Sequence, residues 1–189
     1  MTMNNIIRTK CIVAGDSTVG KSSIVQSFLT EGSQFPKNYN MTLGLDIQTR
    51  LINVPDTSYS VELYLYDFSG KEFYRDLVLK MSSQPSLVFM VYDATSESSF
   101  KKVVDIYTQI KEETKMSTLK GVLFANKTDL TTRRRVSPKA GNDLSQSLGL
   151  MYFEGSAKDH AGVDEPFFYL VNEWFKMYTD KTQSFKLLS

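Results

Sequence analysis

Residues 15–22 combine the side chains and the spacing of a phosphate site. They fit the pattern G-x-x-x-x-G-K-[ST] and read Gly15-Asp16-Ser17-Thr18-Val19-Gly20-Lys21-Ser22. The two glycines allow the backbone to wrap its N–H groups around phosphate oxygens, and a helix beginning near Lys21 directs the positive end of its dipole at the same anions. Lys21 adds a charge for the β- and γ-phosphates, and the Ser22 hydroxyl is a predicted Mg²⁺ ligand.

Residues 67–72 form a second segment that could serve the same site. Asp67 ends an apolar, strand-like run, and we expect its carboxylate near Mg²⁺, acting through water because this ion keeps several waters of its octahedral shell. Gly70 can bring its backbone N–H close to the γ-phosphate. Asp-x-x-Gly alone is common in turns; its position after the phosphate motif favours a functional interpretation.

Two further segments predict that the site selects a guanine base. They read Asn126-Lys127-Thr128-Asp129 and Ser156-Ala157-Lys158. The Asp129 carboxylate can accept hydrogen bonds from the N1–H and the 2-amino group of guanine, a pair that adenine does not offer. We expect Asn126 to tie this loop to residues 15–22, and the Ala157 N–H to meet guanine O6. Two lysine stems are expected to cover the faces of the base: Lys127 and Lys158.

Apolar runs alternate with helix-like stretches along the chain. The predicted strands are 6–14, 43–54, 61–66, 87–92, 121–125 and 151–154, and the predicted helices are 21–30, 97–115, 138–148 (capped by Ser137) and 164–179. Residues 43–54 and 61–66 resemble an antiparallel hairpin. The alternation predicts an α/β fold with a mostly parallel sheet, in which ligands bind at the carboxyl ends of strands. Since all four motif segments follow strands, we expect them to converge on one edge.

Composition excludes several other functions. The 189 residues are 41% hydrophobic, which fits one packed domain, and the net charge of +1 gives no reason to expect a nucleic-acid partner. The single cysteine, Cys11, cannot form an internal disulfide and favours a reducing compartment. There is no apolar run of membrane-spanning length, and the end of the chain offers no cysteine for prenylation, so we expect no direct lipid anchor.

These motifs resemble those of the Ras superfamily of small GTPases, and the Rab branch in particular. The resemblance implies a P-loop NTPase G domain: a six-stranded, mostly parallel sheet with one antiparallel strand and helices on both faces, within a single domain of 189 residues (G domain about 7–180, tail 181–189). Around residues 35–44 the chain resembles switch I, so Phe35 is expected edge-on to guanine and Thr42 on Mg²⁺. The expected metal ligands are Ser22, Thr42 and Asp67. The expected contacts with GTP or GDP are Ser17, Thr18, Val19, Gly20, Lys21, Ser22, Ser23, Phe35, Thr42, Gly70, Asn126, Lys127, Asp129, Ser156, Ala157 and Lys158.

Within that branch, the chain is similar to the Rab-like GTPases of intraflagellar transport. The similarity involves residues 41–44, 54–57, 60–63 and 124–130, and Pro166-Phe167 at the entry to the last helix. It implies a protein of the cilium or flagellum and the cytoplasm that belongs to the intraflagellar transport B complex. It also implies a small β-sandwich partner, subunit 25 of that complex, and contacts with further B-complex subunits.

One departure from the Rab pattern predicts slow catalysis. Rab proteins usually have glutamine directly after the switch II glycine, whereas this chain has Lys71. Glutamine both donates and accepts hydrogen bonds and so orients the attacking water, but an ammonium only donates. Lys71 could lie against the γ-phosphate or point to solvent, and either position loses the water-orienting group. We assign no catalytic residue.

The last predicted helix carries more apolar surface than one buried face requires. Its first stripe should cover the sheet: Val163, Phe167, Leu170, Trp174 and Met177. A second stripe is predicted to bind the protein partner, together with Phe185, Leu187 and Leu188: Phe168, Val171, Phe175 and Tyr178.

Three functions remain open on the sequence. The first is a GTP-hydrolysing switch, in the intraflagellar transport B complex or as another soluble Rab-like trafficking GTPase. The second is an adaptor subunit that binds GTP with negligible hydrolysis, favoured by Lys71. The third is an ATP-using P-loop enzyme, which Asp129 opposes.

Overall fold

A computed structural model gives the fold and describes residues 5–34, 42–69, 86–114 and 119–188, with side chains as far as residue 184. Its strands are β1 (Asn5–Gly15), β2 (Leu45–Asn53), β3 (Tyr59–Phe68), β4 (Leu87–Asp93), β5 (Lys120–Asn126) and β6 (Met151–Glu154). Its helices are α1 (Lys21–Leu29), α3 (Glu97–Thr114), α4 (Pro138–Leu148) and α5 (Asp164–Leu188), with a short 3-10 turn, η2 (Thr131–Arg133). The predicted Phe35, Gly70 and Lys71 lie outside the described residues.

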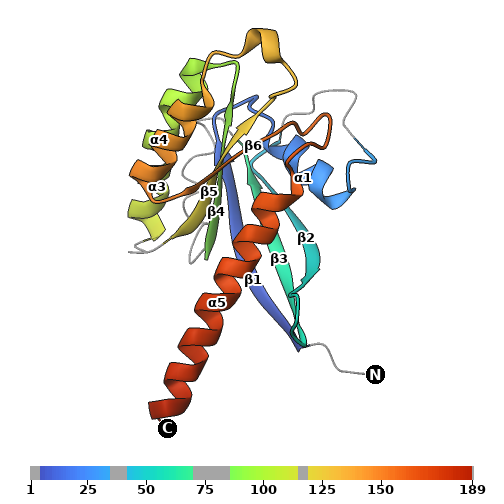
Figure 1. Ribbon diagram of the computed structural model, residues 1–189, viewed down its shortest axis with the longest axis vertical. Helices are drawn as coiled ribbons and strands as arrows, with labels where there is room; N and C mark the ends of the chain where they lie inside the picture. The colour runs from blue at the N-terminus through green and yellow to red at the C-terminus, as the bar shows by residue number, and fades with distance from the viewer. Residues whose placement is uncertain (1–4, 35–41, 70–85, 115–118, 189) are drawn as a thin grey trace.

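The strands form one six-stranded sheet in the order β2-β3-β1-β4-β5-β6 (Figure 1). Every neighbouring pair is parallel except β2 and β3, which form the predicted antiparallel hairpin. Such an order requires crossover connections; α3 supplies the one from β4 to β5, and α4 supplies the one from β5 to β6. The α/β architecture predicted from the alternation of elements is therefore confirmed.

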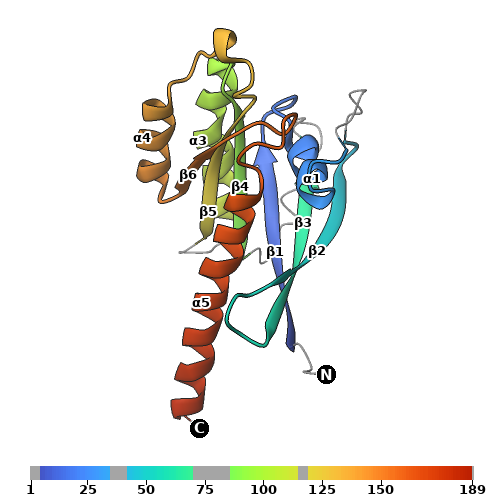
Figure 2. The same cartoon turned by 45° about the vertical axis from the view of Figure 1, so that its right-hand side comes forward.

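Helices cover both faces of the sheet because successive strand residues point to opposite sides. Figures 1 and 2 show α1 and α5 over one face and α3 and α4 over the other. In β4, Phe89 belongs to the hydrophobic cluster beneath α1 and α5. Its neighbours Val88 and Met90 belong to the cluster beneath α3 and α4. All three are fully buried, so neither face of β4 is open to a ligand.

α4 begins where its sequence signals predict. The Ser137 hydroxyl accepts a hydrogen bond from the Ala140 N–H at 3.2 Å, which satisfies one free donor of the first turn. Pro138 occupies the first helical position, where its missing N–H removes no intrahelical bond. Gly149 closes the helix in the left-handed conformation at φ 71°.

α5 is longer than predicted, and one of its residues was assigned to the wrong side. It begins at Asp164 but runs to Leu188 rather than ending near Thr179, because residues 180–188 contain no glycine or proline to stop it. Figure 1 shows its last turns passing beyond the lower ends of β4 and β5. Val171, predicted in the partner stripe, is fully buried in the core, since the sheet and α1 cover a wide face of this helix. No helix in the described ranges is long and apolar enough to cross a bilayer.

Phe28, near the end of α1, joins three elements. Its ring stacks on Phe167 of α5 with the ring centroids 4.0 Å apart. On β2, the Arg50 guanidinium lies 4.2 Å from the Phe28 ring centroid, a cation–π contact, and also donates a hydrogen bond to the Phe28 carbonyl. A second arm of the guanidinium pairs with Glu31 at 2.9 Å. The end of α1 is thereby held between β2 and α5.

Candidate nucleotide site

The four motif segments meet at one edge of the sheet, as predicted. β1, β3 and β5 end at Gly15, Phe68 and Asn126, which lie in or beside three of the segments. β6 ends at Glu154, two residues before the fourth. All four strands run in the same direction, so their carboxyl ends lie together at the upper edge in Figure 1. Loops at such an edge are where α/β sheets bind ligands.

The first loop needs both of its glycines. Gly20 has φ 96°, and a Cβ placed there would lie 2.4 Å from the Asn126 Nδ2 atom. Gly15 has φ 151°, and its Cβ would lie 2.2 Å from the Val91 carbonyl oxygen. Thr18 takes a left-handed backbone at φ 63°, and the Ser17 N–H donates to the Asp16 carboxylate at 2.8 Å. α1 begins directly after Gly20, so its free N–H groups face this loop.

Lys21 is a buried cation that, within the described part of the chain, has no carboxylate in hydrogen-bond contact. Its side chain is only 6% exposed, and its ammonium donates to the carbonyl oxygens of Gly15 (3.0 Å) and Asp16 (2.7 Å). Burial lowers the pKa of Lys21 to about 8, against the opposing charges of Asp67 and Asp16. Two carbonyl dipoles compensate an ammonium only partly. An anion such as a phosphate would balance the remaining positive charge of the ammonium.

The three predicted metal ligands lie together although they come from three segments. The Ser22 and Thr42 hydroxyl oxygens are 2.8 Å apart, and the Thr42 hydroxyl donates to Asp67 Oδ2 at 3.4 Å. Asp67 is 2% exposed, and its Oδ1 atom has no hydrogen-bond partner among the described residues. Burial is the main cause that raises the pKa of Asp67 above its usual range. A buried carboxylate with an unused oxygen beside two hydroxyls fits a hard cation such as Mg²⁺.

The third segment is tied to the first by Asn126, as predicted. The side chain is 2% exposed, and its Nδ2 donates to the Val19 carbonyl at 2.8 Å. Its Oδ1 accepts from the Ala157 N–H at 3.1 Å, which links the fourth segment as well. The Ala157 N–H, which the sequence predicts to bind guanine O6, therefore donates to Asn126 in this structure.

Asp129 lies between the third and fourth segments. Its side chain is 11% exposed; Oδ1 accepts from the Ser156 hydroxyl at 2.8 Å, and Oδ2 lies 3.9 Å from the Lys158 ammonium. Ser156 is 1% exposed, so its hydroxyl supports Asp129 from within the protein. In the ranges that the structure describes, Oδ2 has this long ion pair as its one contact, and the lysine is 62% exposed. The carboxylate can thus accept further hydrogen bonds from a ligand.

Lys127 reaches back over the first loop, where the structure gives it a partner that the motif analysis missed. Its ammonium donates to the Thr18 carbonyl at 2.8 Å and pairs with Asp93 at 2.7 Å. Asp93 ends β4 and lies opposite Asn126 in the register of β4 and β5. Asp93 also lies at the carboxyl end of a strand, but unlike the other site residues it belongs to no sequence motif.

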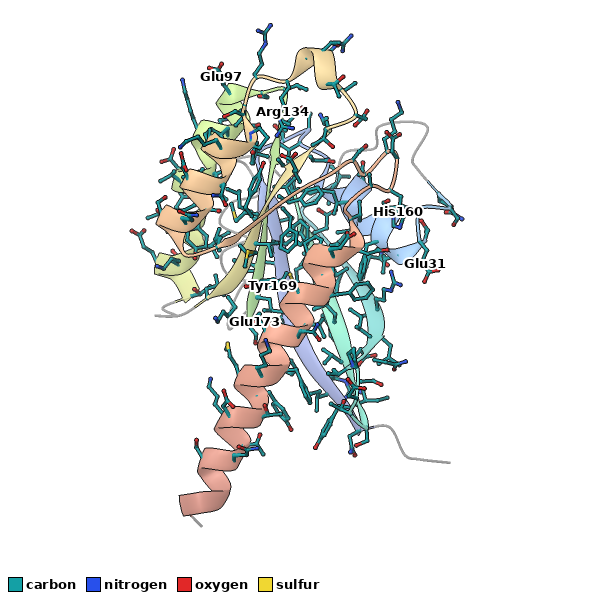
Figure 3. The ribbon with its side chains drawn as sticks, in the orientation of Figure 1. Glu31, Glu97, Arg134, His160, Tyr169 and Glu173 are labelled. Carbon is teal, nitrogen blue, oxygen red and sulfur yellow. The ribbon has the colours of Figure 1, made fainter. Side chains whose placement is uncertain are left out.

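His160, the only histidine of the chain, is a second residue without a predicted role. Its Nδ1 lies 2.9 Å from the Ser27 hydroxyl of α1, and its Nε2 lies 3.2 Å from the Asp164 carboxylate at the start of α5. Figure 3 places it between the end of α1 and the start of α5. Ser27 is 1% exposed, so this Ser–His–Asp arrangement offers no accessible nucleophile. It joins two helices to the fourth segment.

The remaining predicted contacts also lie at this edge, so far as they are described. Ser23 is half-buried in the first turn of α1, and Val19 is 1% exposed beneath the loop. The described residues contain no group of three or more His, Cys, Asp or Glu side chains that could hold a metal ion. The arrangement therefore offers a buried cation for phosphate, hydroxyl and carboxylate oxygens for a hard metal, and a carboxylate for a base.

Comparison with known families agrees with this geometry. A family model described as the Ras family matches residues 10–176. The chain therefore belongs to the Ras family of small GTPases, and its six-stranded mixed sheet is that of a Ras G domain.

Individual relatives extend the similarity over nearly the whole chain. An intraflagellar transport protein 27 homolog of Bos taurus is 37% identical over 182 residues, covering 96% of this chain and 98% of its own. Intraflagellar transport protein 27 of Chlamydomonas reinhardtii is 32% identical, covering 95% and 90%. The Ras-related protein Rab-28 of Caenorhabditis elegans is 38% identical over 151 residues, covering 79% of this chain and 60% of its own.

Proposed function

We propose that this Ras-family chain is a guanine-nucleotide switch that binds GTP and GDP with Mg²⁺ at the carboxyl edge of its sheet. One observation carries the proposal: Asn126 bonds both the Val19 carbonyl and the Ala157 amide. This joins the loop that holds the buried Lys21 to the loops that hold Asp129. A phosphate group and a purine base would therefore be bound by one connected structure.

Nucleotide content tests this proposal directly. The purified protein is denatured, the released nucleotide is identified chromatographically, and binding of GTP, GDP and ATP is compared with Mg²⁺ present. We expect GDP or GTP in the preparation and a preference of at least about a hundredfold over ATP. An empty protein, or equal binding of ATP, would overturn the proposal.

For the metal, we assign Ser22 and Thr42 as direct ligands and Asp67 as a ligand through water, supported by their proximity and by the unpartnered Asp67 oxygen. Mg²⁺ would neutralise phosphate charge beside Lys21. EDTA should then speed GDP release about tenfold or more, and Asp67→Ala should speed it by a similar factor even with Mg²⁺ present. The release rate of a fluorescent GDP analogue checks this metal assignment. A wild-type protein whose release rate does not change with EDTA would contradict it.

Slow hydrolysis follows from Lys71, which lies outside the described residues. We expect Lys71→Gln to raise the single-turnover rate of GTP hydrolysis about tenfold, because the amide can orient water. Lys71→Ala is the matched control: it removes the ammonium without adding an acceptor, and should remain as slow as wild type. If the glutamine variant is no faster than wild type, Lys71 is not the cause.

We further propose a role in intraflagellar transport, in the cilium or flagellum and the cytoplasm, supported by relatives that carry that name. The proposed partners are the small β-sandwich subunit 25 and other subunits of the B complex. In the predicted partner stripe of α5, Phe168 is 40% exposed, and Phe175 and Tyr178 are half-buried. Aromatic side chains of this kind commonly anchor interfaces.

Deletion of residues 179–189 tests the role of α5. It removes the last turns of the helix, and we expect affinity for the partner subunit to fall about tenfold or more, measured by calorimetry with both proteins in solution. Asp143→Asn, on the exposed side of α4, serves as the control. Unchanged partner affinity after the deletion would show that the last turns of α5 and the tail are not part of the partner surface.

An adaptor with negligible hydrolysis is the second candidate, favoured by Lys71. Partner affinity separates the two functions: a switch binds its effector differently with GDP and with a GTP analogue, whereas an adaptor binds equally in both states.

A further inference from the structure

Asp93 lies at the nucleotide edge although it belongs to none of the four motif segments. It is the last residue of β4 and lies opposite Asn126 in the parallel pairing of β4 and β5. The residue is 9% exposed. A carboxylate in this position must be compensated by the protein around it.

Both oxygens of Asp93 are occupied, and one of them by a residue of the base motif. Oδ2 lies 2.7 Å from the Lys127 ammonium. Oδ1 accepts from the backbone N–H and the hydroxyl of Thr95, at 2.8 and 2.7 Å. Burial alone would raise the pKa of Asp93, but the hydrogen bonds from Lys127 and Thr95 hold it below its usual range. Asp93 therefore presents a fixed negative charge to Lys127.

Lys127 spans from this charge to the phosphate loop. Its ammonium also donates to the Thr18 carbonyl at 2.8 Å. Lys127 and Thr18 both have left-handed backbones, with φ of 66° and 63°, a conformation that residues other than glycine seldom adopt. Such strained positions persist where surrounding contacts hold them, and they gather at ligand sites. We name this set of contacts the Asp93–Lys127–Thr18 bracket.

We infer that Asp93 is a positioning residue for nucleotide retention, acting through Lys127 to keep the bracket closed along the base side of the site. This inference rests on the proposed function. A lysine stem has four rotatable bonds and would sample many rotamers without a fixed partner. Asp93 selects the Lys127 rotamer in which the stem lies along the phosphate loop. In that position the stem would cover the base. Because the bracket faces the base and not the γ-phosphate, GDP and GTP are retained to the same extent.

The test is a double-mutant cycle on the release rate of fluorescent GDP, with Mg²⁺ present. Asp93→Asn keeps the side-chain volume and an oxygen for Thr95 but removes the charge. We expect it to speed release about tenfold, and Lys127→Met to do the same or more. In the Lys127→Met background, Asp93→Asn should add less than about twofold, because the lysine through which it acts is gone. A fluorescent GTP analogue should give the same factors.

Two controls and a replacement variant support the test. Asp143→Asn removes an aspartate that pairs with Lys139 on exposed α4, and should leave release unchanged. Thermal unfolding of nucleotide-free protein shows whether a variant is folded. If Asp93→Asn does not fold, Asp93→Ser replaces it, since it also keeps an oxygen for Thr95 and removes the charge.

The outcomes are distinct. Unchanged release in the single variant would overturn the inference, because Asp93 would then have no role in retention. Effects that add fully in the double variant would also overturn it, because Asp93 would then act independently of Lys127. A wild-type protein that retains neither GDP nor GTP would overturn the proposed function and this inference together. Retention by wild type with unchanged release in Asp93→Asn would overturn this inference only.

Discussion

Asp129→Asn should lower the affinity for GTP about a thousandfold, or ~4 kcal/mol, and should raise the affinity for xanthosine triphosphate. The carboxylate accepts from two guanine donors, N1–H and the 2-amino group. Asparagine turns one acceptor into a donor, which then faces the 2-amino group. Xanthine has a carbonyl at that position and can accept. Competition binding with GTP and xanthosine triphosphate measures the ratio of the two affinities in wild type and in the variant.

The surroundings of Asp129 make this substitution conservative for the fold. Oδ1 accepts from the Ser156 hydroxyl, and an amide oxygen can accept the same bond. Asp159→Asn is a matched control in the same loop, where the side chain is exposed, and should bind GTP as wild type does. An Asp129→Asn protein that keeps its GTP affinity would show that base selection occurs elsewhere.

Lys21→Met should have opposite effects on binding and on stability. Loss of the phosphate-binding charge should weaken GDP and GTP about a thousandfold. The nucleotide-free protein, however, should be at least as stable as wild type, because a buried ammonium held by two carbonyls is replaced by an apolar side chain. Calorimetry measures the expected loss of nucleotide affinity, and thermal unfolding of the nucleotide-free protein measures the expected unchanged or increased stability.

The lowered pKa of Lys21, about 8, also gives both quantities a pH dependence. Phosphate favours the charged lysine, so affinity should be level below pH 8 and fall above it, by up to about tenfold per unit. For stability the sign is reversed. The unfolded chain binds this proton up to its usual pKa of 10.5, so nucleotide-free stability from this group rises between about pH 8 and 10.5. In Lys21→Met both dependences should be lost.

The sequence predicted those elements whose signals are local. β6 begins and ends at the predicted residues, and Ser137 with Pro138 marks the start of α4 correctly, because cap and turn chemistry depend on adjacent residues. The end of α5 was missed for the matching reason: residues 180–188 offer no stop signal, and the apolar pattern alone does not show where a helix ends.

The site was predictable where spacing carries the chemistry. Lys21, Asn126 and Asp129 converge because parallel strands end at one edge. Asp93 was missed since a lone aspartate at a strand end has no pattern of its own, and only the register of β4 on β5 brings it beside Lys127. His160 was given no role from the sequence because its contacts with Ser27 and Asp164 exist only after α1 and α5 have packed together.

The Phe28 stack couples β2 mechanically to α5. Its ring lies between the Arg50 guanidinium on β2 and Phe167 on α5, and Arg50 also binds the last turn of α1. A displacement at the end of α1, where the chain leaves towards Thr42, must therefore act on β2 and on the first turns of α5 at once. Mechanical coupling between β2 and α5 would then need no long relay, because one aromatic ring touches both.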